Sequence, residues 1–281
     1  MRREAAESQS YRGGYSARKE GEWMIKAIFL DVDNTLFSHT QKKVPDDAME
    51  AIHQFQKKGG LVFMATGRHV SELKELELDK LNLDGYVMMN GTIILDRNME
   101  LVAGIEFQGE ALQSLLDLFE RKERPVALLE KNCFYMNYID DVVRQVQVDY
   151  SLAPPAVHGW TGNPLYGGVT YVSREEEAEF KKNEIGPGVL VERWGDFGVD
   201  LVPHSGGKAY GLKQVGKVYN LKPEEMMAFG DADNDLSMLK YAGIGVAMGN
   251  GLDVVKEAAD YVTDSVDEGG VANAMKHFGL I

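Results

Sequence analysis

The ten-residue stretch AIFLDVDNTL, residues 27–36, decides the fold class. The apolar run that begins at residue 25 and ends at residue 30 predicts a short strand buried on both faces. Asp31 and Asp33 follow it directly, and the next two residues are typical of a turn. In an open parallel sheet, ligands bind beyond the carboxyl ends of the strands. The stretch therefore predicts two neighbouring carboxylates at a binding edge, where their mutual repulsion favours a hard cation such as Mg²⁺.

The composition is that of an ordinary soluble globular protein, with 44% hydrophobic and 26% charged residues in a chain of 281. Because the formal net charge is −14, neither nucleic acid nor an anionic membrane surface is an expected partner. No apolar run approaches the roughly 20 residues that a membrane-spanning helix needs. Cys133 is the single cysteine and cannot form an internal disulfide, which is typical of a reducing compartment such as the cytoplasm.

Residues 1–23 differ in kind from the rest of the chain. They are polar and aperiodic, and they lack the apolar segment of a signal peptide. We expect a disordered N-terminal extension here, with Met24 as a candidate for the natural start.

Strands and helices alternate up to residue 91. Apolar runs predict strands at 25–30, 61–65 and 86–89, and amphipathic segments predict helices at about 45–58 and 69–81. This alternation is typical of a doubly wound, Rossmann-like parallel sheet, and the fold class is therefore α/β.

The alternation breaks at residue 92 and returns near residue 208. Mixed hairpins and helices between these points predict a separate α+β unit. We expect a catalytic core made of residues 24–91 and 196–281, with a cap domain of residues 92–195 inserted between its two halves.

Polar residues gather at the predicted ends of three core strands and at the start of one helix. They are Asp31 and Asp33, then Thr66 and Gly67, then Asp231, Asn234 and Asp235, and finally Lys208. Taken singly, each has an ordinary structural explanation, such as an Asx turn, a helix N-cap or a solvated lysine. Their convergence on one edge of a parallel sheet indicates a functional site instead.

Phosphoryl transfer accounts for these residue types, because it needs a nucleophile, cations and an acid for the leaving group. Asp31 can attack phosphorus and form an aspartyl-phosphate, and Asp33 can protonate the leaving oxygen and later activate water. Asp231, with Asp31 and a main-chain carbonyl, can hold Mg²⁺. Thr66 offers the phosphate a hydroxyl group, and Lys208 offers a fixed positive charge that also restrains Asp31.

These residues resemble the four motifs of the haloacid dehalogenase superfamily of phosphatases. Residues 31–35 resemble its first motif, Thr66 its second, Lys208 its third and residues 230–235 its fourth. The position and length of the inserted unit resemble the Cof-type branch, which carries a large α/β cap.

The resemblance implies a role for each matching residue. Asp31 would be the nucleophile and Asp33 the acid/base, and both would bind the metal, Asp33 through its main-chain carbonyl. Asp231 would also bind the metal, and Asp235 would either bind it or support a residue that does. The residues expected to bind phosphate or substrate are Thr66, Gly67, Lys208 and Asn234, and the implied cofactor is Mg²⁺.

Two positions depart from the family pattern. Asn34 stands where this branch usually has glycine, although asparagine tolerates a left-handed backbone better than most residues. Residues 203–207, before Lys208, are close to the usual pattern without matching it. Neither departure removes a catalytic group.

The sequence thus predicts an enzyme, a Mg²⁺-dependent phosphatase acting on a small phosphomonoester such as a sugar phosphate. A relative of the sucrose-phosphate phosphatases is an alternative within the same branch. A phosphate-binding regulatory module with little turnover is an alternative of another class, although pure binding does not require the acid/base Asp33. A mutase is disfavoured, since the cap follows the third strand.

The specific substrate and the oligomeric state cannot be read from the sequence. Candidates for cap residues that face the substrate are Asn132, Tyr135, His158 and Trp160.

Overall fold

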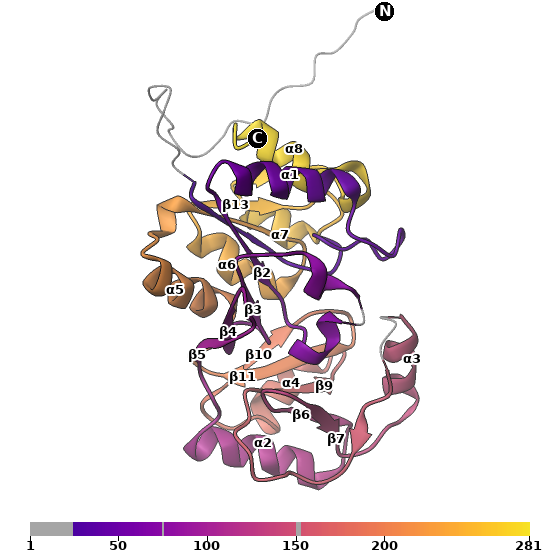
Figure 1. Ribbon diagram of the computed structural model, residues 1–281. Helices are drawn as coiled ribbons and strands as arrows, with labels where there is room; N and C mark the ends of the chain where they lie inside the picture. Colours follow the sequence, from indigo (N-terminus) through magenta and orange to yellow (C-terminus); the bar gives the residue numbers. More distant parts are fainter. Residues whose placement is uncertain (1–24, 75, 150–152) are drawn as a thin grey trace, which may run out of the picture.

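The computed structural model describes residues 25–74, 76–149 and 153–281. The predicted extension of residues 1–23 lies outside these ranges. The protein contains two sheets, each with its own helices, and the two lie one above the other (Figure 1).

A parallel arrangement of three strands forms the centre of the larger sheet. β1 (Ala27–Leu30) pairs in parallel with β2 (Leu61–Ala65) on one side and with β12 (Met226–Gly230) on the other. Leu30 lies opposite both Met64 and Phe229, so the three strands end at the same level. Residues that follow these strands are therefore brought together at one edge.

Within the described ranges, this sheet has eight strands in the order β14-β13-β12-β1-β2-β3-β4-β5. The outer strands are β13 (Ile244–Ala247), β14 (Tyr261–Val262), β3 (Gly85–Met88), β4 (Ile93–Asp96) and β5 (Leu101–Gly104). β4 and β5 run antiparallel to their neighbours, and every other pair in the sheet is parallel.

Helices cover both faces of the larger sheet, which confirms the predicted doubly wound α/β class (Figure 1). α1 (Asp46–Lys57) and α8 (Gly270–His277) pack on the face that carries Ile28 and Leu30. The opposite face carries Ala27 and Phe29 and is covered by α5 (Lys208–Tyr219), α6 (Leu236–Tyr241) and α7 (Asp253–Ala258). Because side chains alternate along β1, each face has its own apolar core.

A smaller sheet of six strands, counted over the described part of the chain, has the order β10-β11-β9-β6-β7-β8. Its strands are β6 (Val126–Leu129), β7 (Phe134–Met136), β8 (Ala156–Val157), β9 (Gly167–Tyr171), β10 (Val189–Arg193) and β11 (Gly198–Pro203). α2 (Gly109–Arg121) and α4 (Glu177–Asn183) pack against one face of it, and α3 (Asp141–Asp149), which the sequence did not predict, lies at one side (Figure 1). The other face turns towards the larger sheet.

The pairing of two strands does not agree with the predicted boundaries of the inserted unit, residues 92–195. β4 pairs with β3 in the larger sheet, whereas β11 pairs with β9 and β10 in the smaller one. The break in the sequence pattern at residue 92 marks a change of strand direction, and the hairpin that follows still packs on the core through Ile93 and Ile94. We therefore propose that the inserted unit is joined to the core at about 105–108 and 204–207.

The prediction of a helix at 69–81 is wrong. The chain forms two short 3₁₀ turns there, η1 (Val70–Leu73) and η2 (Leu78–Lys80), with Glu77 in a left-handed conformation between them. His69 accepts a hydrogen bond from the Ser71 N–H, which favours a tight turn over a regular helix. The remaining 3₁₀ turns are η3 (Pro223–Glu225), η4 (Asp233–Asp235) and η5 (Val266–Glu268). Among the helices of the described residues, none has both the length and the apolar character that a membrane crossing needs.

Candidate active site

A buried lysine joins two of the predicted site residues. The Nζ atom of Lys208 lies 2.6 Å from Asp31 Oδ1 and 2.5 Å from Asp235 Oδ1, and its side chain is fully buried. Lys208 is the first residue of α5, directly after Gly207, whose φ of 95° is readily adopted only by glycine. Burial alone would lower the pKa of Lys208, but the carboxylates of Asp235 and Asp31 hold it above its usual value. The lysine is therefore a fixed positive charge, as the sequence predicts.

Carboxylate oxygens of Asp31, Asp231 and Asp235 lie within 4.8 Å of one another. Burial raises the pKa of Asp31 well above its usual value despite Lys208, and Asp235 and Asp231 raise it further. Burial and the charge of Asp235 raise the pKa of Asp231 to about 7. Such clustered carboxylates repel one another, and a bound divalent cation relieves that repulsion. The oxygen donors suit a hard ion, so this donor set fits the implied Mg²⁺.

The hydrogen bonds of Asp235 distinguish it from the other two carboxylates. Its Oδ1 contacts Lys208, and its Oδ2 accepts from the N–H groups of Asp231 (2.9 Å) and Ala232 (3.0 Å). Both oxygens are thus engaged, and the side chain is fully buried. Asp231 is held differently, because the Thr35 hydroxyl donates to its Oδ1 at 3.0 Å. This geometry favours Asp31 and Asp231 as direct ligands and Asp235 as the residue that positions them.

Asp33 contacts two cationic or basic side chains, those of Arg68 and His39. Arg68 donates from Nε to Oδ2 at 2.8 Å and from Nη2 to Oδ1 at 2.6 Å, and His39 Nε2 lies 2.6 Å from Oδ1. Burial alone would raise the pKa of Asp33, but Arg68 and His39 hold it well below its usual range. The side chain of Asp33 is therefore ionised here and is not part of the carboxylate cluster, which leaves the predicted main-chain carbonyl as its route to a metal.

The predicted phosphate-binding residues lie around the same edge. The Thr66 side chain is buried and its hydroxyl accepts a hydrogen bond from the Arg68 N–H at 3.1 Å. Gly67 cannot carry a side chain without movement, since an added Cβ would lie 2.8 Å from Asp200 Oδ2. Asn234 donates from Nδ2 to Asn90 Oδ1 at 3.2 Å.

Asn90, which accepts the hydrogen bond from Asn234, also contacts the smaller sheet. Asn90 Nδ2 donates to Oδ2 of Asp200, on β11, at 2.5 Å. Burial raises the pKa of the Asp200 carboxyl well above its usual value, and Glu72 and Glu192 raise it further. A chain of hydrogen bonds therefore connects β11 to Asn234 through Asn90.

A cavity of about 180 Å³ opens over these residues, between the two sheets. The larger sheet contributes Asp31, Asp33, Thr66, Gly67, Asp231 and Asn234 to its lining. Lys208 and Asp235 lie beneath that surface, fully buried.

The four cap residues predicted to face the substrate do not line this cavity. Tyr135 points to the α2 side of the smaller sheet, where its ring stacks on His158 at 3.9 Å between centroids. Its neighbours on β7, Phe134 and Met136, line the cavity instead. The four residues have a polar or aromatic character that suits a substrate, whereas alternation along the strand decides which side chains of β7 face the cavity.

The family model for haloacid dehalogenase-like hydrolases matches residues 28–275. The chain belongs to this family. The match confirms the predicted haloacid dehalogenase (HAD) superfamily.

Three known proteins illustrate the likeness of this HAD-like hydrolase to its relatives. The 5-amino-6-(5-phospho-D-ribitylamino)uracil phosphatase YcsE of Bacillus subtilis is 30% identical over 257 residues, which are 91% of this chain and 96% of that protein. The structure of the HAD phosphatase BT1666 from Bacteroides thetaiotaomicron gives a TM-score of 0.84 at 31% identity, covering 94% of this chain and 99% of that chain. The sugar phosphatase BT4131 of HAD subclass IIB gives a TM-score of 0.82 at 32% identity, covering 91% of this chain and 100% of that chain. These likenesses agree with the predicted Cof-type branch.

Several side chains that complete the site were not assigned from the sequence. Arg68 directly follows Thr66 and Gly67, and Asn90 follows β3, so the rule that ligands bind at strand ends would have found both. His39 lies in a loop and gives no such signal. Asp200 stands in an otherwise apolar strand, and an acidic residue in a buried strand is itself a sign of a polar contact.

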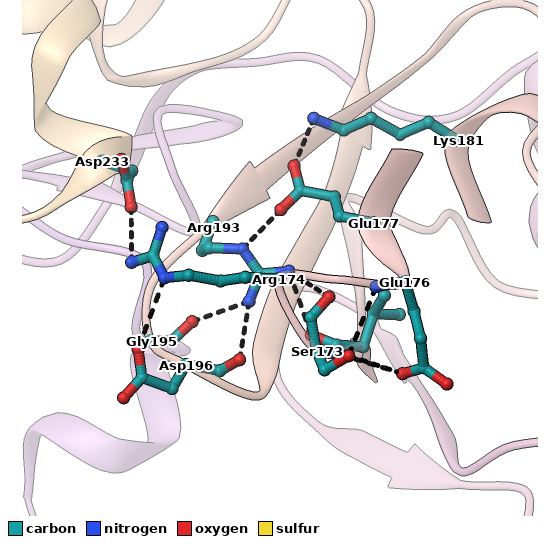
Figure 2. Close-up of polar contacts among 10 residues, drawn as sticks. Ser173, Arg174, Glu176, Glu177, Lys181, Arg193, Gly195, Asp196 and Asp233 are labelled. Carbon is teal, nitrogen blue, oxygen red and sulfur yellow. Dashed lines mark hydrogen bonds and ion pairs between the residues drawn. The ribbon is translucent and has the colours of Figure 1, made fainter. Parts of the chain in front are cut away.

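An ion pair at the surface joins the smaller sheet to the loop that carries Asn234. Arg174 Nη2 lies 2.9 Å from Asp233 Oδ2 and its Nε lies 3.3 Å from Asp196 Oδ1 (Figure 2). Beside it, the buried Arg193 donates to the carbonyl oxygens of Gly195 and Asp196, which fixes the turn between β10 and β11 (Figure 2). The active-site loop of the core is therefore connected to the smaller sheet at two places, through Arg174 at the surface and through Asn90 inside.

Proposed function

We propose that this protein is a Mg²⁺-dependent phosphatase that hydrolyses a small phosphomonoester through an aspartyl-phosphate on Asp31. The chain is an enzyme of the phosphoric monoester hydrolase class, as its family and its phosphatase relatives indicate. The observation that carries the proposal is the contact of Lys208 with Asp31 and Asp235 beside Asp231, at the carboxyl ends of three parallel strands.

In this proposal the Asp31 carboxylate attacks phosphorus while the P–O bond to the leaving group breaks. Lys208 holds Asp31 in one orientation and opposes the rise in its pKa that burial and the two other carboxylates cause. Mg²⁺ bound by Asp31 and Asp231 would neutralise charge on the phosphate oxygens. Water then attacks phosphorus of the aspartyl-phosphate, releases inorganic phosphate and restores the Asp31 carboxylate.

Asp33 is ionised in the present arrangement, so it first takes up a proton from solvent, then gives that proton to the leaving oxygen, and later takes one from the attacking water. Both of its oxygens are engaged by Arg68 and His39 in the present arrangement. Because an Asp33 carboxylate held by Arg68 and His39 has no proton to give, we propose that one of these contacts opens before the leaving oxygen is protonated. Arg68, once released, stays within the cavity, where its guanidinium group suits a phosphate or carboxylate of the substrate.

The substrate in this proposal is a small soluble phosphate ester. One relative is named for 5-amino-6-(5-phospho-D-ribitylamino)uracil and one structural neighbour is titled a sugar phosphatase, and both names describe phosphomonoesters of metabolite size. We also propose a reducing, cytoplasmic location, since Cys133 is a free, exposed thiol.

A phosphate-binding regulatory module remains the alternative, and turnover distinguishes the two. Purified protein is incubated with a panel of phosphorylated metabolites, with Mg²⁺ or with a chelator, and released phosphate is measured. We expect release that requires Mg²⁺ and disappears in Asp31→Asn. Tight binding of phosphate esters without release, in the presence of Mg²⁺, would instead favour the regulatory module.

A further inference from the structure

The cavity has two chemically different walls. The larger sheet supplies the carboxylates and hydrogen-bonding groups described above. The smaller sheet supplies mainly apolar and aromatic side chains, namely Leu129, Phe134, Met136, Val169, Tyr171 and Trp194. We call these six residues the apolar wall.

The apolar wall follows from the alternation of side chains along the strands of the smaller sheet. On β6, Leu129 faces the cavity while Leu128 packs under α2. On β7, Phe134 and Met136 face the cavity while Tyr135 packs on the other side. The wall is therefore a continuous sheet face, and the sequence keeps it apolar over several strands. Contact of such a face with water is unfavourable, and covering it with an apolar group lowers the free energy.

Three polar side chains that border the apolar wall are already engaged within the protein. Arg68 binds Asp33, and Asp200 accepts from Asn90. His69 Nε2 lies 2.8 Å from the carbonyl oxygen of Glu130. A substrate rich in hydroxyl groups would have to break such contacts or lose its own hydrogen bonds to water, and either change weakens binding.

We propose that the leaving group of the substrate carries an apolar ring that packs on the apolar wall. A phosphomonoester with such an apolar ring is then preferred over a sugar or polyol phosphate. The inference rests on the proposed phosphatase function and names the class of substrate for that site. A dry apolar cavity of about 150 Å³ accommodates benzene, so the cavity of about 180 Å³ here has room for about one ring. The Tyr171 hydroxyl, whose pKa burial raises, stays protonated and can donate one hydrogen bond to a substituent of the ring.

The test compares esters of primary alcohols, so that the chemistry at phosphorus is alike. The esters are 2-phenylethyl phosphate, cyclohexylmethyl phosphate, glucose 6-phosphate and glycerol 3-phosphate, each assayed for phosphate release with Mg²⁺. We expect kcat/KM for 2-phenylethyl phosphate and cyclohexylmethyl phosphate to exceed that for glucose 6-phosphate by at least about tenfold. This is the discrimination that a small apolar contact supplies. Equal or higher kcat/KM for the sugar or polyol esters overturns this inference and leaves the phosphatase proposal standing. No release from any phosphomonoester contradicts the phosphatase proposal itself.

Two variants connect the preference to the wall. Phe134→Ala removes a ring that lines the cavity and should lower the ratio of kcat/KM between 2-phenylethyl phosphate and glycerol 3-phosphate by about tenfold. Phe197→Ala is the matched control, because Phe197 is 62% exposed and lies away from the cavity lining. Should Phe134→Ala unfold, Val169→Thr keeps the shape of the wall and adds a hydroxyl, and the same ratio should fall. An unchanged ratio in folded Phe134→Ala or in Val169→Thr overturns the inference.

Discussion

Arg68 binds both carboxylate oxygens of Asp33, with its Nε 2.8 Å from Oδ2 and its Nη2 2.6 Å from Oδ1. The two residues follow neighbouring parallel strands, so the level ends of β1 and β2 bring them together. The pair belongs to the candidate site, and it also stabilises the folded protein.

Arg68→Ala should lower the free energy of unfolding at pH 7 by about 2 kcal/mol, below the roughly 3–5 kcal/mol typical when a fully buried pair is broken. The smaller figure reflects that the side chain of Asp33 is 26% exposed and keeps its contact with His39. The pKa of Asp33 lies below its usual value in the folded state, so its stabilisation is present above the usual pKa and is lost as the pH falls towards the folded-state pKa. Urea unfolding at pH 7, 5 and 3.5 should therefore show the difference between wild type and variant shrinking at low pH. A difference that stays constant over this range would contradict the ion-pair explanation.

Asp31→Asn should reduce phosphate release to less than about a hundredth of the wild-type rate, as expected for loss of one member of a catalytic set. The fold should survive, because burial already favours the neutral form of this side chain and Lys208 keeps its contact with Asp235. Phosphate release and melting temperature are measured together, with the exposed Asp79→Asn as a matched control. Turnover above that level would exclude Asp31 as the nucleophile.

Mg²⁺ should stabilise the protein more at pH 7.5 than at pH 5.5. A carboxyl whose folded-state pKa is raised binds its proton more tightly in the folded than in the unfolded protein, so metal-free stability falls as the pH rises from the usual pKa to the folded-state one. For Asp231 the upper limit of this window is about 7. Mg²⁺ has to displace that proton at the lower pH and meets an ionised carboxylate at the higher one. Melting temperatures with Mg²⁺ and with a chelator measure the effect, and a pH-independent shift, or an equal shift in Asp231→Asn, would count against the proposed metal site.

Asp200→Ala should lower kcat/KM by about tenfold, the equivalent of one lost hydrogen bond of roughly 1.4 kcal/mol. The reason is that Asn90 loses the acceptor that holds it against Asn234. Asp200→Asn keeps an acceptor oxygen at the same place and should retain most of the activity. Steady-state kinetics of the two variants decide the matter, and equal losses in both would show that the charge of Asp200, not the hydrogen bond, is what matters.

The inserted unit should open more readily in Arg174→Ala, since this removes its ion pair with Asp233. Arg174 is 42% exposed on its side chain, and a pair of this kind contributes only about 0–1 kcal/mol, so the loss in kcat/KM should stay below about fivefold. Arg144→Ala is the control, because that arginine pairs with Asp141 within the inserted unit. Hydrogen exchange at residues 105–108 and 204–207 reports the opening. Faster exchange there in the control, or no change in Arg174→Ala, would argue against a hinge at these segments.

Thr66 and Lys208 are already buried in this structure, so closure of the inserted unit over the core is not needed to bury them. Their burial comes from the ends of the core strands and from the start of α5, which local packing fixes. Closure is thus expected to change the exposure of the apolar wall more than that of the phosphate-binding residues.

The core strands and the polar residues at their ends could be predicted from the sequence, because local composition determines them. Apolar runs such as 61–65 end in polar residues, and period and composition suffice to place such strands. The same reasoning predicted Asp31, Asp231 and Lys208 as neighbours, and the structure brings them together. Their catalytic and metal-binding roles stay predictions.

Contacts between distant segments could not be predicted in this way. Residues 69–81 have a helical composition, but the hydrogen bonds of His69 to Ser71 and to the carbonyl of Glu130 hold them in 3₁₀ turns. The contact between Asn90 and Asp200 joins residues 110 positions apart and depends on how the two sheets meet. The orientation of β7, which decides that Phe134 and not Tyr135 faces the cavity, depends on the same packing.

The pair formed by Lys208 and Asp31 has a consequence for the order in which the chain becomes functional. The two residues are 177 positions apart, and the whole inserted unit lies between them. At synthesis rates of about 5–20 residues per second, the lysine emerges roughly 10–35 s after the aspartate. During that interval β1 can pair with β2, but its other neighbour, β12, has not been made. Since Asp231 and Asn234 are proposed to bind metal and phosphate, we expect a nascent chain to bind a phosphate analogue only after residue 235 has emerged, when β12 is also complete.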